Sequence, residues 1–149
     1  MNWLIITSCT GEKRLTHVNQ LTLTDFAKGQ AHLAKREAKL PRQSAEQIYS
    51  GQQHIRLLRG ISALREQGDQ IDFHILSAGY GLISSKRKIA PYEATFADMK
   101  RAELRSWAQK LGIPSDFASL ARQPHDFSLI LLGEAYLAAC KIDAKTQFT

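Results

Sequence analysis

Three short apolar runs, each ending in small or polar residues, constrain the fold of this chain more than any other feature. They are Trp3 to Thr7, Ile71 to Leu76 and Phe127 to Leu132. Runs of this length, rich in Ile, Leu and Phe and bounded by turn residues, are typical of buried strands. Helical patterns separate them, and parallel neighbouring strands need such long crossovers. The sequence therefore predicts an α/β fold with a mainly parallel, twisted sheet flanked by helices.

Two segments between these runs have apolar residues at helical spacing. Ala45 to Glu66 places apolar side chains at three- and four-residue intervals, with Ser44 as the expected N-cap and Gly68 as the stop. Leu104 to Leu111 repeats the pattern, and Asp98 is the expected cap. We therefore expect two long helices.

The length of 149 residues predicts a single α/β domain over 1–149, possibly a fragment of a longer chain. Cys9 and Cys140 are too few for a disulfide scaffold, and no apolar run approaches the roughly 20 residues of a membrane span. We expect a cytoplasmic protein that contacts no membrane. The histidines lack ligand spacing, so no metal site is expected. Neither the cofactor nor the oligomeric state can be assigned.

Candidate functional residues follow the ends of the predicted strands, because ligands of open α/β sheets bind beyond the carboxyl ends of the strands. Cys9 is a candidate nucleophile or a small packed residue, and Glu134 is a candidate general base or an acid favouring a helix N-terminus. Hydroxyl, phenol, ammonium and backbone amide groups there can hold a ligand, or can cap turns and pack. These candidate ligand-binding residues are Ser8, Thr10, Lys13, Ser77, Gly79, Tyr80, Gly81, Tyr92 and Tyr136.

The chain is basic, with a formal charge of +6 and a pI near 9.5. Clustered cations attract phosphates, so we expect an anionic partner, a nucleotide or a nucleic acid. A solvated, soluble surface is an equal alternative. The candidate nucleic-acid-binding residues form two clusters, Lys35, Arg36, Lys39 and Arg42, and Lys86, Arg87 and Lys88.

Taken together, these motifs resemble the YaaA-like group of bacterial and phage α/β proteins, which includes peroxide-stress proteins. The shared pattern is a Ser-Cys turn followed by Lys, a Leu-Ser-small-x-Tyr-Gly-Leu turn, a Pro-Tyr pair and a later Tyr at a helix start. The matching positions are Ser8, Cys9, Lys13, Ser77, Tyr80, Gly81, Leu82, Pro91, Tyr92 and Tyr136. The resemblance implies nucleotide or nucleic-acid chemistry connected with stress or defence.

Three functions are therefore open. The first is an enzyme or binding domain for a nucleobase, nucleoside or nucleotide, with Lys13 holding a phosphate or oxyanion and tyrosines holding the ring. The second is a non-catalytic DNA- or RNA-binding module that uses the two basic clusters. The third is a regulatory domain of a larger protein.

Overall fold

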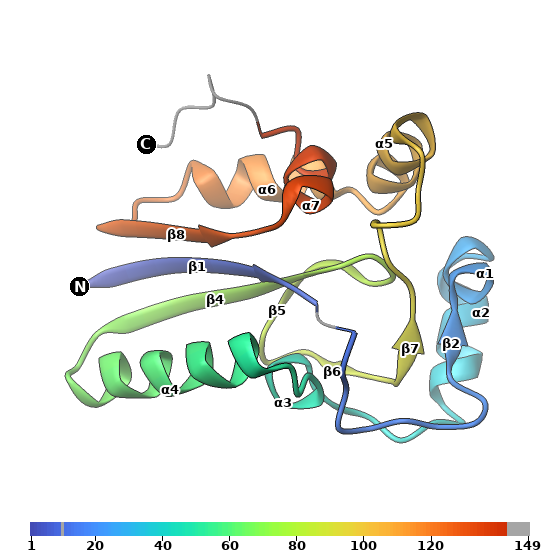
Figure 1. Cartoon of the computed structure of the whole chain (residues 1–149), viewed down its shortest axis with the longest axis horizontal. Coiled ribbons are helices and arrows are strands. Elements are labelled where there is room, and N and C mark those ends of the chain that lie inside the picture. The colour runs from blue at the N-terminus through green and yellow to red at the C-terminus, as the bar shows by residue number, and fades with distance from the viewer. Residues whose placement is uncertain (10, 143–149) are drawn as a thin grey trace.

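A four-stranded sheet forms the centre of the computed structural model, which describes residues 1–9 and 11–142 (Figure 1). Its strands are β1 Asn2–Ser8, β4 Gln70–Ser77, β5 Gly81–Ser84 and β8 Phe127–Leu131. Their order is β5-β4-β1-β8; β1 pairs in parallel with both neighbours, and β4 and β5 are antiparallel. The predicted α/β class and mainly parallel sheet are confirmed, with one antiparallel pair added.

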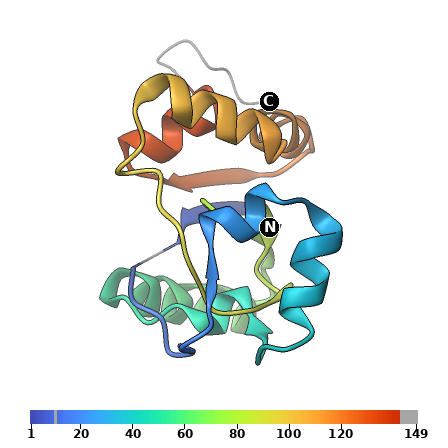
Figure 2. The same ribbon diagram turned by 90° about the vertical axis from the view of Figure 1, so that its right-hand side faces the viewer.

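Helices flank this sheet. Figures 1 and 2 show α3 and α4 on one side of it and α5, α6 and α7 on the other. The helix bounds are α3 Ala45–Ile48, α4 Gln52–Glu66, α5 Arg101–Lys110, α6 Ile113–Ala121 and α7 Glu134–Ala139. Leu4, Ile5 and Ile6 of the central strand are almost fully buried. The core therefore lies against both faces of β1. Among the described residues, no helix has both the length and the apolar character needed to cross a bilayer.

Four two-residue strands and two helices build up the region beyond the carboxyl end of β1. The strands form two pairs, and the helices follow β2 in the chain (Figure 1). Their bounds are β2 Leu21–Thr22, α1 Leu23–Ala27, α2 Gln30–Glu37, β3 Gln43–Ser44, β6 Lys88–Ile89 and β7 Tyr92–Glu93. Because β2 pairs with β7 and β3 with β6, segments far apart in the sequence meet at this edge.

Two details of the helix prediction are wrong. The expected helix from Ala45 to Glu66 is interrupted, because residues 49–51 leave the helical conformation to pair with the loop after β1. Ser50 N–H donates to the Glu12 carbonyl at 3.0 Å. The expected cap Asp98 lies before α5, whose N-cap is Lys100. Asp98 lies inside a turn closed by a 3.1 Å hydrogen bond from Met99 N–H to the Phe96 carbonyl.

Candidate functional site

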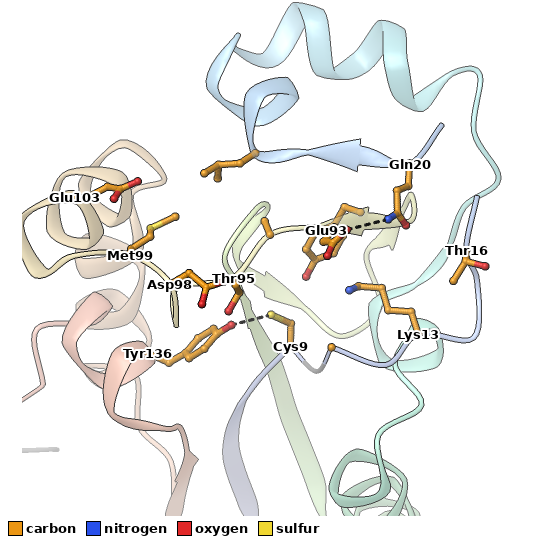
Figure 3. Close-up of a pocket in the computed structure, with 14 residues that line it drawn as sticks. Cys9, Lys13, Thr16, Gln20, Glu93, Thr95, Asp98, Met99, Glu103 and Tyr136 are labelled. Carbon is orange, nitrogen blue, oxygen red and sulfur yellow. Dashed lines mark hydrogen bonds between the residues drawn. The ribbon is translucent and has the colours of Figure 1, made fainter. Parts of the chain in front are cut away.

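A pocket of about 870 Å³ opens at the carboxyl end of β1, and we call it the Cys9 pocket (Figure 3). Its walls come from the loop after β1, the β2–α1 segment, β7 with the chain that follows it, α5 and α7. The lining residues are Cys9, Gly11, Lys13, Thr16, Gln20, Leu23, Tyr92, Glu93, Ala94, Thr95, Asp98, Met99, Glu103 and Tyr136. The volume falls within the range of small-molecule sites.

Cys9 is held in place by the end of the sheet. Its N–H donates to the Leu76 carbonyl at 2.9 Å, which extends the pairing of β1 with β4 by one residue. Its Sγ lies 3.3 Å from the hydroxyl of Tyr136, which α7 brings across the pocket. Burial, and secondarily the neighbouring thiol, raise the pKa of Tyr136. The phenol therefore keeps its proton at neutral pH and can donate it to sulfur.

Lys13 supplies a half-buried ammonium beside the thiol. Its backbone bridges to Tyr49, and its Nζ lies 4.6 Å from the ring centroid of Tyr92. Burial lowers the pKa of Lys13, while Cys9 and Glu93 oppose that shift. The ammonium thus lies over the ring of Tyr92, with the Cys9 sulfur and the Glu93 carboxylate as the neighbouring groups that favour its positive charge.

Acidic groups outnumber cations in this pocket. Glu93, Asp98 and Glu103 line it, and Lys13 is the one cation among the lining residues that the structure describes. Three carboxylates against one ammonium favour a ligand that presents N–H groups or positive charge, and disfavour a bare anion. The sequence reasoning missed these three acids. The available signal was their position in the segment directly after the Pro-Tyr motif.

Ser77 lies behind the pocket in a chain of buried hydroxyls. Its Oγ donates to the Tyr92 hydroxyl at 2.7 Å, and the Tyr92 and Tyr49 hydroxyls are 2.5 Å apart. The same Oγ accepts from the N–H groups of Gly79 and Tyr80 at 3.1 and 3.0 Å. Burial raises the pKa of both phenols well above the usual value. The serine holds its turn together and is fully enclosed.

Tyr80 points away from the Cys9 pocket. Its hydroxyl donates to Glu37 and accepts from Ala90 N–H, both at 3.0 Å. It lines a separate hollow of about 330 Å³ together with Arg87, and we call this hollow the Arg87 pocket. Gly79 lines the same hollow.

Glu134 is also outside the Cys9 pocket. Its side chain is 92% exposed, in the first turn of α7, and its nearest cation is Arg101 at 4.0 Å. Ser8 lines a third hollow, formed with the N-terminal part of α4. Gly81 has a φ of +86° at the start of β5, a backbone conformation suited to glycine. Thr10 lies outside the described residues. Of the predicted site residues, the pocket brings together Cys9, Lys13, Tyr92 and Tyr136.

One end of each basic cluster adjoins the paired strands β3 and β6. Their pairing sets Ser44 opposite Lys88 and Gln43 opposite Ile89, so the antiparallel register leads Arg42 away from Lys86 and Arg87. Several of the cations have partners within the protein: Lys86 pairs with Glu46 at 3.5 Å, and Arg36 with Asp25 at 3.2 Å. The remaining members are exposed, and they are Lys35, Lys39, Arg42, Arg87 and Lys88.

Among the described residues, no three His, Cys, Asp or Glu side chains are placed to hold a metal ion together.

The comparisons with known proteins give one match. Searches of curated proteins and of solved structures match nothing. The resemblance to the YaaA-like group is tested by none of the comparisons and stays a prediction. A family model described as a family of unknown function, DUF6884, matches residues 33–148. That range includes Tyr92 and Tyr136 and begins after Cys9 and Lys13. Since the match covers most of the chain, this protein belongs to the DUF6884 family.

Proposed function

We propose that the Cys9 pocket binds a nucleobase, as part of a nucleoside, a nucleotide or a nucleic acid, and that Cys9 is the reactive group facing it. The observation that supports this proposal most is the meeting of Cys9, Lys13 and Tyr136 around one pocket. These residues come from opposite ends of the chain. Their convergence lies at the carboxyl edge of the parallel strands, where ligands of open α/β sheets bind.

The chemistry of the lining suits a nucleobase. A base presents ring N–H and exocyclic amino groups, which carboxylates such as Glu93 and Asp98 accept, and carbonyl oxygens, to which the Lys13 ammonium donates. The phenol ring of Tyr136 provides an aromatic surface. A bare phosphate would meet three carboxylates here, so the base is the part of a nucleotide that this pocket suits.

Cys9 is the best candidate for a nucleophile. A thiolate is the reactive form of cysteine, and negative charge on sulfur would be stabilised by the Tyr136 hydroxyl at 3.3 Å and by the ammonium of Lys13. Glu134 is 92% exposed and does not line the pocket. We assign proton transfer instead to the lining carboxylates.

Thermal unfolding with a panel of nucleobases, nucleosides and nucleotides tests this proposal. A ligand present at about 100 times its Kd adds about 2.7 kcal/mol of stability, which raises the Tm of a domain of this size by about 5–10 °C. We expect Asp98→Asn to weaken the shift, because it removes the negative charge and replaces one of the two acceptor oxygens by an NH2 donor, and Glu134→Gln to leave it unchanged. A panel without any shift would contradict the proposal.

A second candidate, a non-catalytic nucleic-acid-binding module, is favoured by the exposed cations Arg87 and Lys88 and by Arg42, which lies two residues from Ser44, the pairing partner of Lys88. Binding by such a surface depends steeply on salt. Neutralising Lys86, Arg87 and Lys88 together would then abolish retention of DNA, while Cys9→Ala would leave it intact. Retention that survives the triple substitution would exclude this candidate.

A further inference from the structure

The Cys9 pocket continues into a groove that leads to the Arg87 pocket. A hollow of about 220 Å³ lies between α1 and α5, and we call it the α1–α5 groove. It shares Leu23, Met99 and Glu103 with the Cys9 pocket. It shares Ala27, Trp107 and Lys110 with the Arg87 pocket. The three hollows therefore form one path along α5, past the labelled Met99 and Glu103 in Figure 3.

The charge changes sign along this path. Glu103 lies at the end that the groove shares with the Cys9 pocket, and Lys110 and Arg87 lie at the other end. Glu103 and Lys110 are seven residues apart on one helix, which corresponds to about 10 Å of helix rise. Among the described residues, no carboxylate lines the Arg87 pocket. A ligand that spans the path would need hydrogen-bond donors at one end and an anion at the other.

Arg87 is held in place for such an anion. Its guanidinium lies 5.1 Å from the ring centroid of Tyr80, a distance typical of a cation–π contact. Tyr80 is fixed in turn by its hydrogen bonds to Glu37 and to Ala90 N–H. Because the ring beneath it is locked, less side-chain entropy is lost when the guanidinium binds a phosphate.

The lining of the α1–α5 groove distinguishes two ligands that carry phosphate, a nucleoside with a chain of phosphates and a short nucleic-acid strand. Leu23, Met99 and Trp107 provide apolar surface there, with Glu103 beside them. A chain of phosphates extending from a base would lie on apolar side chains next to a carboxylate, which is unfavourable. A second nucleoside, with its sugar and flat base, suits this surface.

We infer that the path binds a short single strand of nucleic acid, with one base in the Cys9 pocket, the next nucleoside along the α1–α5 groove and a backbone phosphate at Arg87 and Lys110. This inference rests on the proposed function and names its substrate class. It differs from binding by a general basic surface, because it requires Arg87 and Lys110, which line the path, and not the neighbouring cations that line none of its hollows.

Fluorescence anisotropy with a labelled single-stranded hexanucleotide tests the inference. We expect the double variant Arg87→Ala/Lys110→Ala to weaken binding at least tenfold. We also expect the slope of log K against log salt to become shallower by about 0.7, since each phosphate neutralised on a single strand contributes about 0.7. The matched control is Lys88→Ala/Arg105→Ala, which removes the neighbour of Arg87 and another cation of α5; neither lines any of the three hollows. The control should bind like the unmodified protein.

Equal losses in the two double variants would overturn the inference, and so would a nucleoside triphosphate that competes as well as the strand. The nucleoside-induced Tm shift separates this inference from the proposed function. If the shift persists while the hexanucleotide does not bind, the inference fails and the proposed function stands. If both are absent, both fail.

Discussion

Replacing Ser77 with Ala tests whether this serine supports the turn or binds a ligand. In the structure its hydroxyl is fully buried and makes three hydrogen bonds, one to Tyr92 and two from the N–H groups of Gly79 and Tyr80. The substitution leaves both N–H groups buried without that partner, at about 1–3 kcal/mol each. Tyr92 keeps its bond to the Tyr49 hydroxyl.

We therefore expect Ser77→Ala to lower the free energy of unfolding by about 3 kcal/mol, which lowers the Tm of a domain of this size by about 6–12 °C. Tyr49→Phe removes a single bond from the same chain of hydroxyls and should cost about 1 kcal/mol. Ser128→Ala, at an exposed position of β8, should stay within about 0.5 kcal/mol. Urea denaturation of the three variants measures these differences.

Ligand affinity measured on the folded fraction completes the test. If Ser77 is structural, the variant binds nucleosides with unchanged affinity wherever it remains folded. A variant that keeps its full stability but loses binding would refute this reasoning, and would show that the hydroxyl reaches the ligand as the sequence motif predicts.

Gly79→Ala and Asp25→Asn probe the surroundings of the site, with Gly60→Ala as a control. Gly79→Ala places a Cβ against the Cε2 of buried Phe26, so we expect a loss of about 1–3 kcal/mol in the free energy of unfolding. Gly60→Ala, in open space on α4, should stabilise the fold by up to about 1 kcal/mol in the same urea assay. A hydrogen bond with His32 lowers the pKa of Asp25, so this carboxylate stabilises the fold above its unfolded pKa near 3.9. That stabilisation is lost as the pH falls toward the folded pKa. Asp25→Asn should therefore be less stable at neutral pH and approach the unmodified protein in acid, and a constant difference in unfolding midpoint across that range would contradict this.

The main strands could be predicted because each is a continuous apolar run. Burial on both faces demands such a run in β1, whereas Phe127, Leu129 and Leu131 of β8 are exposed. The short strand β5 could not be predicted in the same way. Its pairing with β4 depends on the turn at Ser77 to Gly81, and a four-residue strand carries little pattern of its own. The two-residue strands depend wholly on long-range contacts. The helix break at Tyr49 has the same origin, since the pairing partner lies in the loop after β1.

The candidate site was predictable in position but only partly in membership. The pocket is lined by Cys9 and Lys13, which the strand ends predicted, and by Tyr92, which the Pro-Tyr motif predicted. Their roles in binding or catalysis stay predictions. Whether a polar side chain in a turn faces the ligand or its own backbone cannot be read from residue type. The Ser77 hydroxyl accepts hydrogen bonds from the amides of its own turn. The Tyr80 hydroxyl accepts from Ala90 N–H, away from the Cys9 pocket. Both side chains carry a hydroxyl group that could bind a ligand, and in both cases hydrogen bonds within the protein occupy that group.

The net charge of the chain does not describe the charges in the pocket around Lys13. A charge of +6 describes the whole surface, whereas the field in a pocket depends on the few charged groups within several ångströms. The carboxylate that acts on Lys13 is Glu93, and Asp98 and Glu103 line the same pocket, so we place the base rather than the phosphate there. The cations suited to a phosphate, Arg87 and Lys110, lie at the far end of the groove. A nucleic-acid strand carries base N–H donors and phosphates a nucleoside apart, so one ligand satisfies both ends.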